Sequence, residues 1–253
     1  MINVLRSEWI KLRTVKMNWI LGGIALAFPL LVTLLTAYFS GDDEGVDARS
    51  LVELLTGTSV VATLLCGMIA AASITSEFGF GTIRPTFAAV PRRLRVIVGK
   101  GIVAVCAAMV LVTIVVLIGV FVGRPLAEGQ GATIDFDRYS GIVPALLGTI
   151  LLAGLMSLAG YGLGLLTRST PAAISILIVW PLIAEGLIGS LIGVITGWDS
   201  VIEWMPFQSG IRLVFVEYPD VGGPSRVVSG FYFGGVAALL AAVGGWAVNR
   251  RDA

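Results

Sequence analysis

Long apolar runs alternate with short polar segments along this chain. A segment needs about 20 mostly apolar residues to cross the hydrocarbon core of a bilayer. Six runs reach that length, and no other segment is long enough to form a soluble domain. The sequence therefore predicts an all-α polytopic membrane protein, a single transmembrane domain over residues 1–253. Its six helices are expected at residues 19–39, 51–75, 102–122, 142–166, 172–196 and 228–248.

Composition agrees with this pattern. Of the 253 residues, 57% are hydrophobic and only 13% are charged, whereas a soluble domain carries about 25% charged residues. A soluble chain of this length could not build a core large enough to bury so much apolar surface. A soluble globular protein is therefore excluded.

Basic residues are distributed unequally between the two sides that six spans define. Twelve of the seventeen Lys and Arg residues fall in the N-terminus, the second and fourth connecting segments and the C-terminus. Twelve of the sixteen acidic residues fall on the opposite side. Because an excess of Lys and Arg marks the cytoplasmic side, we expect both termini and a loop at residues 77–98 in the cytoplasm, and residues 197–227 outside.

Two segments outside the spans have an interfacial character. Residues 1–17 place apolar side chains on one helical stripe, which Glu8 and Lys16 interrupt, and this pattern predicts an amphipathic helix in the headgroup plane. A basic tail that only sets topology is the alternative. Residues 197–227 carry several aromatic residues and predict short re-entrant or interfacial helices, broken at Pro206 and Gly210, that form either an outer cap or a surface lid. The residues expected at the lipid interface are Arg6, Trp9, Lys11 and Arg13.

Catalytic chemistry finds little support. The only Gly-Lys pair, Gly99-Lys100, lacks the preceding glycine and the following Ser or Thr of an ATP-binding loop. The chain has no His, which removes the commonest general base and metal ligand. Cys66 and Cys106 lie in apolar runs without a CxxC partner. We expect no catalytic site, metal site or cofactor in this chain.

Glu185 is an acidic residue inside a predicted span. A charge at that depth costs about 2.5–3.5 kcal/mol on insertion scales and usually faces a cavity or a partner. It follows Trp180-Pro181, where a proline is expected to kink the helix. Two interpretations stay open: a cavity-facing or gate residue, and a neutral, hydrogen-bonded carboxyl within the bundle.

Small residues recur in the fourth and sixth spans. Gly160 and Gly164 are four residues apart, as are Gly230 and Gly234. This spacing places small residues on one face and allows helices to pack closely. It predicts a multi-helix bundle.

Residues 77–100 read EFGFGTIRPTFAAVPRRLRVIVGK. Topology requires the arginines but not the interleaved aromatic and apolar residues Phe78, Phe80, Ile83 and Phe87. A short helix that exposes apolar and basic side chains suits a helix-in-groove contact with a partner protein. A basic turn that only sets topology is the alternative.

Three features together resemble a known family. They are SEWIKLRTVK before the first span, EFGFGTIRPTFAAVPRR followed by Lys100, and the outer segment before the last span and a short basic tail. With six spans in this order, the chain resembles an ABC transporter permease of the six-span bacterial exporter class (type-2 ABC transporter membrane protein). The resemblance implies a subunit of the bacterial plasma membrane that couples ATP hydrolysis to substrate export.

The resemblance also implies partners and residue roles. Two separate cytoplasmic ATPase subunits would bind ATP and Mg²⁺, and a second copy or a related permease would complete the path. Residues 1–17 would be the connecting helix, and residues 77–91 the coupling helix, which Pro85 shortens. The residues expected to contact the ATPase are Glu77, Ile83, Arg84, Phe87, Arg92 and Arg93, with Glu77 paired to a basic residue there. Those expected along the path are Thr56, Thr58, Thr63 and Glu185.

Two functions of other classes are weighed against the exporter. An intramembrane enzyme acting on lipid is disfavoured by the missing His and the lone carboxylate within the spans. A non-transport membrane component, such as an ATPase-coupled sensor, an immunity factor or a scaffold, has the same sequence features as an exporter. An ATP-binding subunit in a neighbouring reading frame would favour the transporter.

Overall fold

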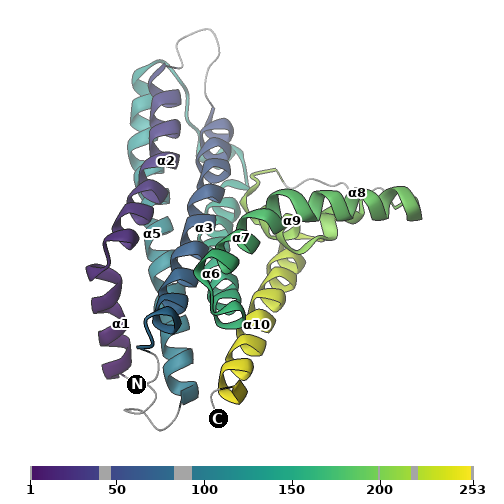
Figure 1. Ribbon diagram of the computed structural model, residues 1–253. Coiled ribbons are helices and arrows are strands. Elements are labelled where there is room, and N and C mark those ends of the chain that lie inside the picture. The colour runs from purple at the N-terminus through teal and green to yellow at the C-terminus, as the bar shows by residue number, and fades with distance from the viewer. Residues whose placement is uncertain (1, 40–46, 83–92, 199, 218–221, 252–253) are drawn as a thin grey trace.

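The computed structural model describes residues 2–39, 47–82, 93–198, 200–217 and 222–251. Helices dominate the described residues, and no strand occurs among them (Figure 1). The α-helices are α1 (Ile2–Thr14), α2 (Lys16–Phe39), α3 (Ala48–Gly79), α5 (Arg93–Gly129), α6 (Ile142–Thr167), α7 (Thr170–Val179), α8 (Glu185–Thr196), α9 (Pro206–Ile211) and α10 (Arg226–Arg251). The short elements are the 3₁₀ helices η1 (Phe136–Arg138), η3 (Val201–Trp204) and η4 (Arg212–Val214) and the π-helical turn η2 (Trp180–Ala184).

Six segments are long and apolar enough to cross a membrane, and they confirm the all-α prediction. They are α2, α3, α5, α6, the continuous segment Thr170–Thr196 and α10. The predicted boundaries were too narrow for the longest of them. α5 has 37 residues and α3 has 32, because both helices continue past the apolar run into polar sequence.

α6 is the central helix of the bundle and packs against α3, α5 and α10. Its glycines allow the close approach that their spacing predicted. A Cβ on Gly160 would lie 2.1 Å from the carbonyl oxygen of Gly67 on α3, and one on Gly162 would lie 2.5 Å from the backbone nitrogen of Ala241 on α10. Two successive small positions of α6 therefore face two different neighbours.

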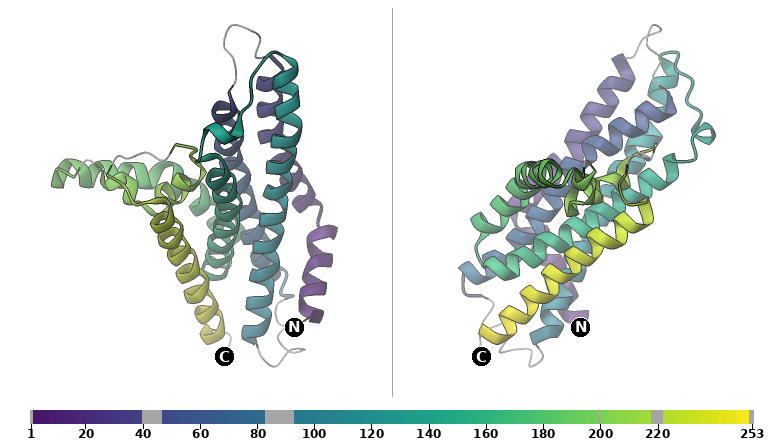
Figure 2. Two further views of the ribbon diagram at one scale, coloured as in Figure 1. Left: turned by 180° about the vertical axis from the view of Figure 1, so that it is seen from behind. Right: turned by 90° about the vertical axis from the view of Figure 1, so that its right-hand side faces the viewer.

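The fifth span is not a straight helix. The π-helical turn η2, which contains Pro181, joins α7 to α8. A proline lacks the N–H that the regular helix needs, and this favours a local change of helical type. α8 projects sideways from the other spans (Figures 1 and 2), and apolar side chains such as Leu187, Leu191 and Val194 are exposed on it.

The outer segment between α8 and α10 forms the short helices η3, α9 and η4. The predicted break at Pro206 coincides with the first residue of α9. The predicted break at Gly210 is wrong, because Gly210 lies within α9. There it packs against Phe233 of α10, and a Cβ at position 210 would lie only 2.8 Å from the Phe233 ring. This glycine therefore allows close packing of α9 on α10 and does not mark a bend.

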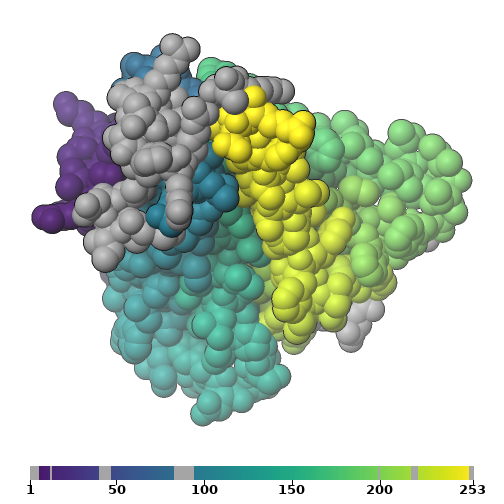
Figure 3. All heavy atoms as spheres, turned by 90° about the horizontal axis from the view of Figure 1, so that it is seen from below, coloured from purple at the N-terminus to yellow at the C-terminus, as the bar shows by residue number. Residues whose placement is uncertain are grey.

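Both chain ends lie at the same end of the bundle, as an even number of spans requires (Figures 1 and 2). The end of α3 and the beginning of α5 lie there too, whereas the end of α2, whose last residue is Phe39, lies at the opposite end (Figure 1). Viewed from the terminal end, α1 lies at the rim and α8 projects on the other side (Figure 3). We call this the terminal end of the bundle.

Candidate functional site

Four charged side chains form a compact cluster at the terminal end, and we call it the charge cluster. Lys100 of α5 donates to Glu77 Oε1 at 2.6 Å and to Glu8 Oε1 at 2.7 Å. Lys11 of α1 donates to the same two oxygens, at 2.7 Å for Glu77 and 3.2 Å for Glu8. The cluster thus joins α1 to the last residues of α3 and to the third span.

Two members of the charge cluster are buried, so their ion pair is shielded from water. The exposed fraction is 5% for the Lys100 side chain and 8% for that of Glu77. The two positive and two negative charges balance, which offsets part of the cost of taking each out of water. Removing one partner of such a group leaves an uncompensated charge, which costs about 3–5 kcal/mol. The cluster therefore holds α1, α3 and α5 in one arrangement.

Lys11 is the most exposed member of the cluster, at 48% of its side chain. Burial lowers its pKa, but hydrogen bonds and attraction to Glu77 and Glu8 outweigh this effect, and the pKa lies above its ordinary value of 10.5. Lys11 therefore keeps its proton across the physiological pH range.

Further contacts tie the neighbouring segments to this end. The hydroxyls of Thr75 on α3 and Thr170 at the beginning of α7 lie 2.6 Å apart. The guanidinium of Arg168 lies 5.1 Å from the centre of the Phe78 ring, within the range of a cation–π contact. The end of α3 and the fourth connecting segment are thereby attached to each other beside the charge cluster.

Of the six residues predicted to contact an ATPase, two lie within the described residues. Glu77 is buried, and its Oε1 pairs with Lys11 and Lys100 of the same chain. This internal pairing competes with the expected contact between Glu77 and a basic residue of an ATPase subunit, and that contact stays a prediction. Arg93 is the first residue of α5. Ile83, Arg84, Phe87 and Arg92 lie outside the described residues.

The threonines predicted along a translocation path all donate hydrogen bonds to backbone carbonyl oxygens. Thr56 is 1% exposed and donates to the carbonyl oxygen of Val214 at 2.9 Å. Thr63 is fully buried and donates to the carbonyl oxygen of Val60. Thr58 is half-buried and bonds to the carbonyl oxygen of Leu54 on its own helix. In this conformation the hydroxyls of Thr56 and Thr63 do not face open space.

Glu185 is fully buried at the first residue of α8. Its carboxylate accepts hydrogen bonds from the backbone N–H of Phe207 and Gln208 at 2.8–3.0 Å and from the Trp180 indole at 3.0 Å. Those backbone groups belong to the first turn of α9, which has no side-chain cap of its own. The carboxylate supplies this cap from 22 residues away, so the hydrogen-bonded interpretation of Glu185 is the one the geometry supports.

The residues predicted at the lipid interface all lie on α1. Arg6, Trp9 and Arg13 are exposed, and Lys11 is half-exposed. The Trp19 indole at the beginning of α2 donates to the carbonyl oxygen of Arg13 at 2.7 Å. This bond fixes the turn between α1 and the first span.

The sequence reasoning did not identify Glu8 and Lys100 as site residues. A signal for each was present. Glu8 interrupts the apolar stripe of α1, and Lys100 stands among apolar residues at the beginning of a membrane-spanning helix. A charge on an apolar face indicates an opposite charge on the facing element, and each of the two is the partner of the other.

No group of three or more His, Cys, Asp or Glu residues that could hold a metal ion occurs in the described part of the chain. The charge cluster consists of ion pairs that join α1, α3 and α5. Such ion pairs can transmit force between the helices that they join.

A family model decides the identity of a chain with this architecture. Residues 4–197 match the model described as "ABC-2 family transporter protein". The chain belongs to the ABC-2 transporter family. Comparisons with curated proteins and with solved structures gave no match. This ABC-2 protein is a permease component of an ABC transporter, and its family normally pairs with an ATP-binding subunit. The matched residues include the charge cluster and five of the six candidate spans; the sixth, α10, follows them.

Proposed function

We propose that this permease is the membrane-spanning subunit of an ATP-driven exporter and that cytoplasmic ATPase subunits contact its terminal end. The observation that carries the proposal is the charge cluster. It ties α1 to the helix that ends just before residues 80–92 and to the helix that follows them. A displacement of residues 80–92 by the ATPase would therefore move α1, α3 and α5 together.

The mechanism follows from this connection. ATP and Mg²⁺ are bound by two separate ATPase subunits, which close on each other when ATP binds. Residues 77–91 move with them, and the buried pair Glu77–Lys100 transmits the movement to α3 and α5. The spans tilt, and the substrate cavity between the two permease subunits changes from open toward the cytoplasm to open toward the outside. Such coupling is a free energy shared between the nucleotide site and the substrate site.

A second permease, identical or related, completes the path. The fifth span is the one least covered by the rest of the chain, with 17% of its most apolar window buried. α8 exposes Leu191, Val194 and Ile195 at 61%, 85% and 73%. A neighbouring permease would cover this face. Thr56 and Thr63 would face the path only after α3 has moved, since both are buried here.

The orientation belongs to the proposal as well. The excess of basic residues on that side supports a cytoplasmic location for the terminal end in a bacterial cell. The ATPase would then approach from the side on which ATP is available. The outer segment η3–α9–η4, held by Glu185, would lie on the extracytoplasmic side.

Co-purification with the ATPase tests this proposal. The permease and the ATP-binding subunit of a neighbouring reading frame are co-expressed, and both retention of the ATPase and ATP hydrolysis by the complex are measured. The double variant Arg84→Glu/Phe87→Ala reverses one charge and removes one aromatic ring in the docking segment. We expect the ATPase to be lost from the complex.

The matched control lies away from the docking segment. Arg124 and Phe136 form a cation–π pair with 5.5 Å between the guanidinium and the ring centre, and Arg124→Glu/Phe136→Ala changes the same residue types there. This control should retain the ATPase. Equal retention in both variants would contradict the docking proposal.

A further inference from the structure

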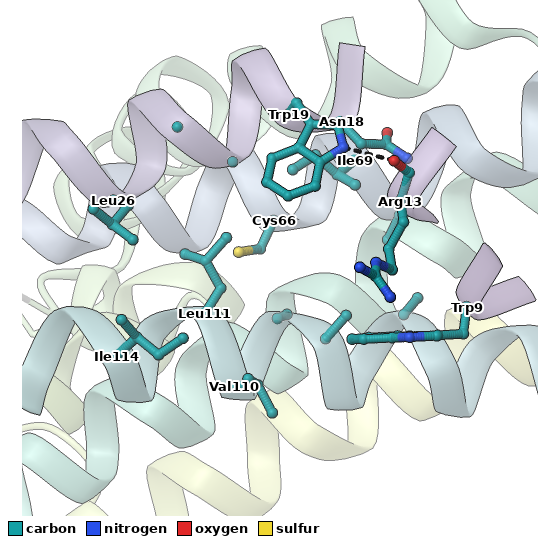
Figure 4. A pocket seen from close by; sticks show the side chains of 16 residues that line it. Trp9, Arg13, Asn18, Trp19, Leu26, Cys66, Ile69, Val110, Leu111 and Ile114 are labelled. Carbon is teal, nitrogen blue, oxygen red and sulfur yellow. Dashed lines mark hydrogen bonds between the residues drawn. The ribbon is translucent and has the colours of Figure 1, made fainter. Parts of the chain in front are cut away.

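A groove of about 400 Å³ lies between α1, α2, α3 and α5 (Figure 4). This volume is within the range of ligand sites, about 300–1,000 Å³. Leu26, Leu111 and Ile114 lie at one end of the groove, and Arg13 and Trp9 lie at the other (Figure 4). Arg13 is the one charged residue among the described residues that line it.

Small residues keep the groove open. Gly22 and Gly23 line it from α2, and Ala104, Ala107 and Ala108 line it from α5. A Cβ on Gly23 would meet no atom within 4 Å, so the space beside it is unfilled by the protein. From Ala104 to Ile114 the wall extends ten residues along α5, about 15 Å at 1.5 Å per residue. That is half of the roughly 30 Å hydrocarbon core, the depth of one leaflet.

The polar end of the groove carries an uncompensated positive charge. Among the described residues, no carboxylate lies within ion-pair distance of Arg13. Its neighbour Lys11 is already paired with Glu8 and Glu77. Trp9 and Trp19 flank the guanidinium (Figure 4), and tryptophans are enriched at the level of the headgroups.

We propose that this groove holds one acyl chain of an anionic glycerophospholipid, with the lipid phosphate at Arg13. The guanidinium presents paired N–H donors that match phosphate oxygens. Beyond it, the groove walls formed by Gly23 of α2 and by α5 as far as Ile114 are apolar and would lie along the acyl chain. The lipid would lie in the same leaflet as α1. It would fill the space between the interfacial helix and the first and third spans, and so attach α1 to the bundle on the side away from the charge cluster.

Native mass spectrometry of the purified permease tests this site with phosphatidylglycerol and, separately, with phosphatidylcholine. We expect one phosphatidylglycerol retained per chain and weaker retention of phosphatidylcholine. Arg13→Gln removes a charge-assisted contact and should weaken phosphatidylglycerol retention about tenfold or more, which abolishes the preference. Gly23→Leu fills the groove and should remove the retained lipid altogether.

Two matched variants control for general effects. Arg95→Gln removes an exposed base on α5 outside the groove. Gly235→Leu places the same side chain on α10, where a Cβ also meets nothing within 4 Å. Both should retain phosphatidylglycerol as the wild type does, and circular dichroism checks that every variant keeps its helices. Equal retention of the two lipids, or unchanged retention in Arg13→Gln and Gly23→Leu, would overturn the proposal.

Discussion

Glu185 shows how one side chain can organise a distant segment. Its carboxylate accepts the N–H groups of Phe207 and Gln208, which begin α9, and the indole N–H of Trp180 on the π-helical turn. In hydrocarbon an unsatisfied backbone group costs several kcal/mol. The carboxylate therefore fixes the outer segment to the fifth span.

Replacement of Glu185 by Gln should destabilise the protein by about 1–3 kcal/mol, because an amide offers one acceptor oxygen in place of two and brings its own donors toward buried N–H groups. The free energy of unfolding in mixed micelles measures this loss. Glu128→Gln, which alters an exposed pair with Arg124, is the control and should cost about 1 kcal/mol or less. Unchanged stability in Glu185→Gln with loss of transport would instead make Glu185 a residue of the path.

A double-mutant cycle tests the charge cluster at the same scale. Lys100→Met and Glu77→Gln should each cost about 3–5 kcal/mol in free energy of unfolding, since each leaves the cluster of two positive and two negative charges with one charge uncompensated. The double variant should cost less than the sum by about 0.5–3 kcal/mol. Lys11→Met should cost less than Lys100→Met because Lys11 is half-exposed. Strict additivity would show that Glu77 and Lys100 act independently.

At the scale of elements, the packing of α6 against α3 depends on glycine. Gly160→Ala places a methyl group 2.1 Å from the carbonyl oxygen of Gly67, so the two helices must separate. We expect a loss of about 1–3 kcal/mol in free energy of unfolding. Gly57→Ala on α3, where nothing lies within 4 Å, should be neutral or stabilising by up to about 1 kcal/mol. A similar effect of both substitutions would contradict close packing at Gly160.

The beginning of α3 depends on a pH-sensitive cap. Asp47 accepts hydrogen bonds from the backbone N–H of Ser50 and from the Tyr139 hydroxyl. Burial raises the pKa of Asp47, but the hydrogen bonds from Ser50 and Tyr139 and the charge of Arg49 outweigh it, and the pKa lies below the ordinary value of 3.8. The cap thus stabilises the fold above the unfolded-state pKa, and this contribution is lost as pH falls through the folded-state value.

Asp47→Asn tests this sign. Asparagine still caps a helix but carries no charge. Melting temperatures of wild type and Asp47→Asn should therefore differ at neutral pH, and the difference should shrink below about pH 4, where an ordinary Asp carboxylate gains a proton. A difference that stays constant over this pH range would show that the charge of Asp47 does not contribute.

The helices that depend on the local order of apolar and polar residues could be predicted from the sequence. The six spans follow from apolar runs, and α1 follows from its periodicity. The π-helical turn could not be predicted in type, although Pro181 indicated a kink. Partners of Glu185 and Glu77 were unpredictable because they lie 22 and 66 residues away. Charges in apolar surroundings, at Glu8, Lys100 and Glu185 itself, indicated that such partners exist without showing where they lie.

At the scale of the whole molecule, the two ends of the bundle have different roles in this account. The terminal end carries the charge cluster and the segment proposed to meet the ATPase, and the opposite end carries the cap of Asp47. Phe80 closes α3 at the terminal end with 84% of its surface exposed, and Phe39 closes α2 at the opposite end with 74% exposed. These two aromatic positions make a matched pair of probes.

Site-specific photo-cross-linking from Phe80 and Phe39 in intact cells tests the central claim most directly. A photoreactive amino acid replaces each phenylalanine in turn, and the cross-linked products are examined for the ATP-binding subunit. The account predicts that the probe at position 80 captures the ATPase and that the probe at position 39 does not. Capture from position 39 with none from position 80 would contradict it.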